Sequence, residues 1–247
     1  MIGNVYLRSG TGCLLAFLFL AGGCAQYSKV VQPTSKLAQL SPELASLTDE
    51  KIELYLRSTA KPQFPTVLAV AKLRELYRYH ERDAGFTLAS IQGREADGWL
   101  KLAKTSKNVN QVHFVSPLLL QGSTNLKNLR DAAALVHAPL LLVYLETENA
   151  AEGYNSSAMA YWSIVGLFVV PGNTVGHYTL CQAILVDTRT GVIVATAQSD
   201  SIKEENVLFG AVEIARDRVK REAHEDAVTR LQNDFHKTLD ELVRSSK

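Results

Sequence analysis

Cysteine is scarce in this sequence, with three among 247 residues, at Cys13, Cys24 and Cys181. The first two fall in or next to a predicted export segment, described below. Cys181 is then alone, and this excludes an intramolecular disulfide in the mature chain. Its stability must come from a hydrophobic core, for which a hydrophobic content of 47% is sufficient.

Neither sign of charge is in excess. The chain carries 26 Lys and Arg against 25 Asp and Glu, for a formal charge of +1. Without a basic field, nucleic acid is not expected as a partner. The 7 prolines and 15 glycines are also too few for a fibrous or low-complexity chain.

Motifs that would mark an enzyme are missing as well. The sequence has no Gly-x-Ser-x-Gly elbow and no phosphate loop ending in Gly-Lys-Ser/Thr. His177 and Cys181 lie four residues apart on an expected strand, roughly 13 Å from each other, which is too far to share a zinc ion. Glu146 and Glu148 are expected to be solvated at the end of a strand rather than paired in an apolar setting. We therefore predict no catalytic residue, no metal ligand and no cofactor, and a protein that is not an enzyme.

The N-terminus carries the features of an export signal. Arg8 supplies a positive charge, and residues 13–21 read CLLAFLFLA, an apolar run too short to cross a bilayer. Leu20-Ala21-Gly22-Gly23 then places small residues directly before Cys24. This arrangement predicts a lipoprotein signal peptide over residues 1–23 and a mature N-terminus at Cys24, which carries diacylglycerol and palmitate. The alternatives are an uncleaved anchor and an ordinary signal peptide that is cut nearby.

The residue after the cysteine indicates in which membrane a lipoprotein is retained. Bacterial sorting retains lipoproteins in the inner membrane when an aspartate follows the acylated cysteine, and Ala25 stands here. We therefore expect the outer membrane, with the domain facing the periplasm. The acyl chains on Cys24 would then bind the bilayer.

Hydrophobic periodicity predicts an α/β (α+β) fold, a mixed sheet with packed helices. Residues 24–47 are polar and are expected to form a tether, and residues 48–247 a periplasmic domain. Within that domain the pattern predicts a short helix over 48–58, longer helices over 86–104, 125–136 and 212–243, and strands over 64–73, 111–117 and 139–148. Residues 177–187 and 192–201 are expected to form a hairpin, in which Asp187 and Gly191 make the turn. The final helix is amphipathic and follows the hairpin directly.

One segment, residues 158–172, is apolar and free of charge over its whole length. Two interpretations remain open. A run of this length is most often a buried core element. It could instead form a surface that contacts the membrane or a partner through Tyr161, Trp162, Phe168 and Val169, since Tyr and Trp suit the membrane interface.

The same segment carries a resemblance to a known family. YWSIVGLFVVPG, residues 161–172, followed by HYTLCQAILVDTRTG, resembles the rhombotarget lipoproteins. Those bacterial proteins combine a lipoprotein leader, a similar apolar stretch, a hairpin and a charged C-terminal helix. The family name implies a tie to rhomboid-type proteases, although this chain ends in LVRSSK without a Gly-Gly motif. A helix that enters a strand through Ala138-Pro139 is also similar to the curli-secretion lipoprotein of the outer membrane.

These observations favour a non-enzymatic outer-membrane lipoprotein that serves as a membrane-tethered interaction or assembly module. Its partners would be the bilayer, through acylated Cys24, and an envelope protein or a second copy of the chain. The alternative is a subunit of an envelope secretion or export assembly in which residues 158–172 contact the membrane or a neighbouring subunit. A third possibility is an enzyme whose polar residues converge only in three dimensions.

Overall fold

The fold is organised by a six-stranded mixed sheet, seen in a computed structural model that describes residues 27–33, 40, 48–58, 62–75, 85–120 and 123–245. The strands are β1 (Thr66–Glu75), β2 (Phe86–Ala89), β3 (Val109–Phe114), β4 (Leu140–Tyr154), β5 (Asn173–Asp187) and β6 (Ile193–Val207). Their order is β2-β1-β4-β5-β6, and β3 also pairs with β1. The predicted α+β class with a mixed sheet is confirmed.

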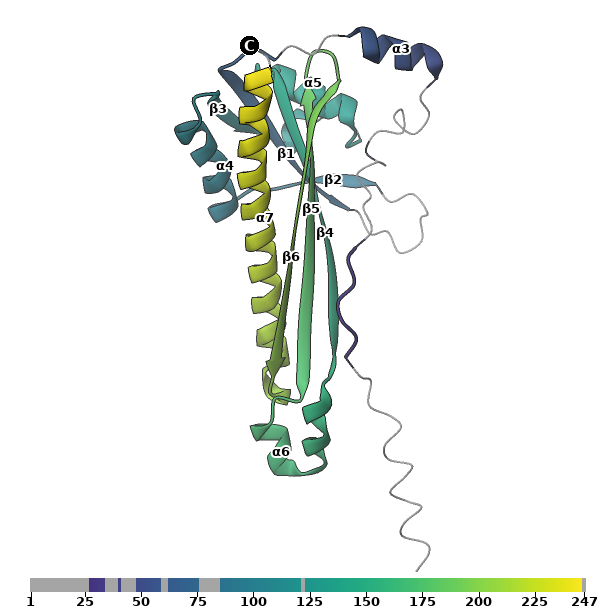
Figure 1. Ribbon diagram of the computed structural model, residues 1–247, viewed down its shortest axis with the longest axis vertical. Helices are drawn as coiled ribbons and strands as arrows, with labels where there is room; N and C mark the ends of the chain where they lie inside the picture. Colours follow the sequence, from purple (N-terminus) through teal and green to yellow (C-terminus); the bar gives the residue numbers. More distant parts are fainter. Residues whose placement is uncertain are drawn as a thin grey trace, which may run out of the picture.

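The sheet is wide at one end and narrow at the other (Figure 1). β1 pairs with β4 in parallel, from Leu68↔Leu140 to Leu73↔Leu145, and its other edge pairs with β3 and β2. β1 ends at Glu75, two residues after its last pair with β4, whereas β4, β5 and β6 are each 15 residues long. At about 3.3 Å per residue such strands span roughly 50 Å. The second half of the sheet is therefore a ribbon of three strands.

Helices cover both faces of the sheet. They are α3 (Asp49–Arg57), α4 (Gly93–Thr105), α5 (Leu126–Leu135), α6 (Ile164–Val169) and α7 (Val212–Ser245), with short 3₁₀ helices η2 (Pro117–Leu119), η3 (Ser156–Trp162) and η4 (Phe209–Ala211). α4 and α7 lie on one face and α5 on the other (Figure 1). α7 runs along nearly the whole sheet, because buried residues recur along it at intervals of about four: Ala215, Val219, Ala223, Ala227, Leu231, Phe235 and Leu239.

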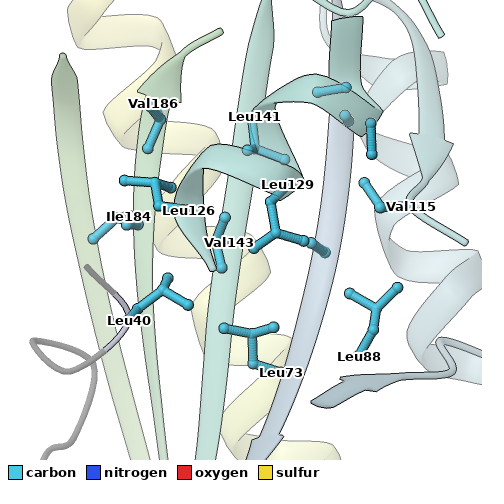
Figure 2. Close-up of a cluster of buried hydrophobic side chains, with 14 of the residues drawn as sticks. Leu40, Leu73, Leu88, Val115, Leu126, Leu129, Leu141, Val143, Ile184 and Val186 are labelled. Atoms are coloured by element: carbon cyan, nitrogen blue, oxygen red, sulfur yellow. The ribbon is translucent and has the colours of Figure 1, made fainter. Parts of the chain in front are cut away.

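Two apolar clusters fill the wide end of the molecule. Under α5, Leu126 and Leu129 pack against Leu141 and Val143 of β4 (Figure 2). Under α4 and α7 the ring of Trp99 lies 5.6 Å from that of Tyr144 and 5.9 Å from that of Phe235. A smaller cluster of Val175, Val207, Ala215 and Val219 holds α7 to the ribbon. The narrow end is thus held by much less apolar packing than the wide end.

The helix predicted over residues 86–104 is wrong at its start. Residues 86–89 form β2, in which Phe86 and Leu88 are buried and alternate with half-buried neighbours, and β2 pairs antiparallel with the end of β1. α4 begins only at Gly93, where φ is +57°. Gly98 within α4 has a packing role, because a Cβ there would come 2.1 Å from Oε1 of Gln232 on α7.

The other predicted elements are confirmed, with shifted ends. Oγ1 of Thr48 accepts from the backbone N–H of Lys51 and caps α3. In the hairpin turn, Oδ1 of Asp187 accepts from the backbone N–H of Thr190, and Gly191 has φ +77°. No helix among the described residues has both the length and the apolar character needed to cross a membrane.

The predicted leader and Cys24 lie outside the described residues. Of the predicted tether the structure describes residues 27–33 and Leu40, and both Val30 and Leu40 are buried against the domain. The division at residue 47 stays a prediction.

Candidate functional site

The segment between β4 and β5 forms a small structure at the narrow end of the molecule, which we call the tip (residues 155–172; Figure 1). It consists of η3 and α6, folded back on themselves. The carboxamide of Asn155 accepts from the N–H of Ser157 and donates to the carbonyl of Pro171. The hydroxyl of Ser163 caps α6 by accepting from the N–H of Gly166 at 3.0 Å. These local bonds close the tip, and the carboxamide of Asn155 also donates to Thr174 of β5 and Asn206 of β6.

The apolar side chains of the tip point into solvent. The exposed fraction is 83% for Met159, 89% for Trp162, 79% for Ile164, 70% for Val165, 71% for Phe168 and 67% for Val169. The expectation of a buried core element is therefore wrong. The physical reason is that the last pair of the β4–β5 ladder is Tyr154↔Asn173, so no sheet face lies beyond it to cover these residues.

Tyr161 has a different position from the other three residues predicted to make contact. It is half-buried, and its hydroxyl accepts from the N–H of Gly172 and from the side chain of Asn173, both at 2.9 Å. Its ring lies 6.2 Å from that of Tyr154 and 6.4 Å from that of Phe209. Tyr161 therefore holds the tip together, whereas Trp162, Phe168 and Val169 form its outer surface.

A second segment extends this surface, and the sequence reasoning missed it. Phe209 in η4 and Ile214 at the start of α7 are 55% and 72% exposed. The signal that could have revealed Phe209 is the uncharged run of residues 207–212 just before the charged helix. Ordinary amphipathic patterning predicts that an apolar residue such as Ile214 is buried.

The N-terminal segment of residues 27–33 lies beside β4, and its first residue, Tyr27, is at the end nearer the tip (Figure 1). The carboxamide of Asn149 donates to the carbonyl of Val31, and the N–H of Tyr27 donates to the carbonyl of Tyr154 at 2.8 Å. The phenol of Tyr27 reaches over Gly176 to Glu204, and burial together with this carboxylate raises the pKa of Tyr27 to about 12. Since Tyr154 is the last residue of β4, the described N-terminal segment begins at the base of the tip.

A buried ion network lies beneath α7, near the middle of β4. The ammonium of Lys72 (β1) donates to both carboxylate oxygens of Glu95 (α4), at 2.9 and 3.0 Å, and lies 3.0 Å from Oε2 of Glu146 (β4). Glu146 also binds Nδ1 of His224 (α7), and the hydroxyl of Tyr144 donates to Glu95 at 2.6 Å. The expectation that Glu146 is solvated is therefore wrong, because α7 and α4 cover the strand at this point.

The electrostatics of the network follow from its pairing. Burial would raise the pKa of Glu146, but the hydrogen bond with His224 and the charge of Lys72 outweigh it, and the pKa is lowered. The hydrogen bond with Glu146 likewise raises the pKa of His224. Burial would lower the pKa of Lys72, yet the charges of Glu146 and Glu95 raise it. With His224 protonated, two carboxylates face two cations and the network is neutral.

The network opens onto a cleft of about 1070 Å³ where β1 ends and β4 continues. Its walls carry groups of both signs, among them Glu148, Lys220 and Arg221. Burial opposes ionisation of Glu148, but the imidazole of His177, 3.7 Å away, and the hydrogen bond from Lys220 lower its pKa to about 2. Glu148 is exposed, as expected, and it is paired with Lys220 of α7. The cleft is therefore lined mainly by charges that already have partners.

Cys181 and His177 both lie buried on β5. Cys181 is a core residue, and burial raises the pKa of its thiol. Among the described residues no cluster of three or more His, Cys, Asp or Glu side chains could hold a metal ion.

Comparison with known proteins gives likenesses of fold only. No protein-family model matches the chain, and no curated protein sequence matches it. Solved structures that it resembles include the LpoB C-terminal domain from Salmonella enterica, at 16% identity and a TM-score of 0.30, over 56% of this chain and 84% of that one. A Caulobacter crescentus protein described as a lipoprotein matches at 16% identity and a TM-score of 0.28, over 49% and 83% of the two chains. Lipoprotein GNA1162 from Neisseria meningitidis matches at 16% and 0.28, over 62% and 94%. At TM-scores this low, no property of these bacterial envelope proteins is transferred to this chain.

Proposed function

We propose that this protein is a non-enzymatic lipoprotein of the bacterial outer membrane, tethered through acylated Cys24. Its periplasmic domain would act as an interaction or assembly module. The export features of residues 1–23, and Ala25 after the cysteine, support this location. The resemblance of residues 161–172 to the rhombotarget lipoproteins agrees with it.

The observation that carries the proposal is the course of the N-terminal segment. Two residues, Ala25 and Gln26, separate Cys24 from Tyr27, and a chain spans at most about 3.6 Å per residue step, so over three steps the Cα of Cys24 would lie within about 11 Å of that of Tyr27. Tyr27 is bonded to the last residue of β4. In the proposed lipoprotein the attachment point of the lipid would therefore lie near the narrow end of the molecule.

This attachment gives the domain a direction. The three long strands and α7 run from the narrow end to the wide end, and α7 alone, at about 1.5 Å per residue, is roughly 50 Å long. Anchored at the narrow end, the domain would present α3, α4 and α5 to the periplasm at that distance from the bilayer (Figure 1). A module that presents a surface away from the membrane fits a role in binding a partner.

The ion network supports a non-enzymatic role. A catalytic acid, base or nucleophile needs an atom within hydrogen-bonding reach of the substrate. Here Lys72, Glu95 and Glu146 bind one another, and His224 turns its Nδ1 to Glu146. The network serves to hold β1, β4, α4 and α7 together.

Metabolic labelling with radioactive palmitate in a bacterial host tests the proposal. We expect label in the wild type and none in Cys24→Ser. Cys13→Ser is the matched control, because it removes a cysteine of the predicted leader and should keep the label. A labelled Cys24→Ser protein, or an unlabelled wild type, would overturn the proposal. Mass spectrometry of the purified protein should place the mature N-terminus at residue 24.

A further inference from the structure

We propose that the tip is a second membrane contact, which rests in the interfacial layer of the same bilayer that holds the acyl chains of Cys24. This inference relies on the proposed function for the position of the anchor. The occupant of the exposed apolar surface would be lipid, with Trp162, Phe168 and Val169 among the acyl chains and headgroups.

The first argument is the size and continuity of the surface. An aromatic side chain presents about 150–250 Å², so Trp162 and Phe168 alone leave on the order of 300 Å² in contact with water. Met159, Ile164, Val165 and Val169 add to the same short segment. Exposed apolar patches beyond a few hundred Å² mark a binding or membrane surface rather than ordinary surface variation.

The second argument is the absence of charge. Residues 153–176 contain no Asp, Glu, Lys or Arg, and neither do residues 206–212. Charged residues next to the tip include Glu152, Glu205 and Glu213; Arg216 forms ion pairs with Glu152 and Glu213, and Arg218 with Glu205. Inserting the tip would therefore transfer no unpaired charge out of water, which is the main cost of membrane insertion.

The third argument is the depth that the tip can reach. α6 has 6 residues and is about 9 Å long, which suits an interfacial position and is far short of the roughly 30 Å of a bilayer core. Trp162 lies where η3 ends, and its amphipathic ring is typical of the interface. The tip would thus lie in the membrane surface without crossing it.

The position of the anchor favours lipid over the other possible occupants. A second copy or a protein partner could also cover an apolar surface. However, Tyr27 is bonded at the base of the tip, so the acyl chains of Cys24 would enter the bilayer within about 11 Å of Tyr27. The tip would then be held at the lipid surface at a high effective concentration, without the need to meet a partner.

Vesicle flotation of the mature chain carrying Cys24→Ser tests the tip in isolation. This protein has no acyl chain, so its binding does not depend on lipidation, and a failure of the tip is distinguishable from a failure of the anchor. We expect it to float with phosphatidylcholine vesicles and the fluorescence of Trp162 to shift to the blue. Adding Trp162→Ser and Phe168→Ser should lower the partition coefficient at least about tenfold, because most of the transferable aromatic area is lost.

The matched control is Leu118→Ser with Leu135→Ser. Both residues are exposed apolar residues at the wide end, at 95% and 64%, and their replacement should leave the partition coefficient unchanged. Circular dichroism should show the same fold in all variants, since the replaced side chains are in solvent. Equal partition of the tip variant and its parent would overturn the proposal. So would a parent that does not bind vesicles, or one that forms a dimer in solution which the tip substitutions dissociate.

Discussion

The buried ammonium of Lys72 offers the sharpest test of the energetics of this fold. Lys72→Met keeps the length of the side chain and removes the charge that faces Glu95 and Glu146. The side chains of these two carboxylates are 10% and 12% exposed, so water can replace the lost cation only in small part. We expect Lys72→Met to destabilise the domain strongly.

The magnitude follows from the burial of the network. Removing one partner of a buried ion pair costs about 3–5 kcal/mol, because the remaining charge is left without compensation. For a domain of this size each kcal/mol corresponds to about 2–4 °C in Tm, so we expect Tm to fall by roughly 6–20 °C. The matched control is Lys127→Met, whose pair with Asp131 is 2.9 Å long but 75% and 63% exposed. It should cost no more than about 0.5 kcal/mol.

The dependence on pH distinguishes lost charge from lost packing. In the wild type the pKa of Glu146 is lowered, so its contribution to stability is present above the unfolded value of about 4.3 and is lost as pH falls through the folded value. In Lys72→Met, protonation of Glu146 at low pH removes the charge that Lys72 no longer balances. The cost relative to wild type should therefore be largest near neutral pH and should shrink as the pH approaches about 4.

Thermal unfolding followed by circular dichroism, in the Cys24→Ser background, measures both effects. The reasoning would be refuted if Lys72→Met lowered Tm no more than Lys127→Met does. A cost that stays constant between neutral and acid pH would also contradict it, because loss of packing alone has no such dependence.

Three further predictions concern single residues. Cys181 should react with a thiol reagent only after unfolding, since the thiol is fully buried and burial raises its pKa; rapid reaction of the native protein would contradict this. The pKa of His224, raised by its hydrogen bond with Glu146, should fall toward its ordinary value in Glu146→Gln when followed by NMR, and an unchanged pKa would contradict the pairing. Because the pKa is raised, the stabilisation by His224 is fully present below about 6.5 and is lost as pH rises through the folded value. Gly191→Ala should destabilise the domain by about 1–2 kcal/mol in denaturant unfolding, because φ at this position is +77°, and a neutral substitution would refute the assigned turn.

The parts of the fold that the sequence predicted well are those with a strong local period. α7 repeats its buried residues at helical spacing over 34 residues, and the β5–β6 hairpin has an explicit turn at Asp187 and Gly191. β2 was mistaken for the start of a helix because Phe86 and Leu88 are two residues apart and only 4 residues belong to the strand. A run this short does not distinguish the two-residue hydrophobic period of a strand from the 3.6-residue period of a helix.

The candidate sites show a different limit. The charge-free character of residues 158–172 is visible in the sequence, but whether they are buried depends on where the sheet ends. The ion network joins positions 72, 95, 146 and 224, which lie on four different elements. No local pattern links such distant positions, so their convergence becomes visible only in the folded chain.

The tip is joined to the ribbon in a way that allows another loop to take its place. Its two ends lie next to Tyr154 and Asn173, which face each other across the ladder, and none of its residues belongs to the three buried clusters. A different loop of compatible end spacing could therefore replace it at little cost to the fold. Selection can then adapt this end of the protein to another bilayer composition or another binding surface while the rest of the sequence stays the same.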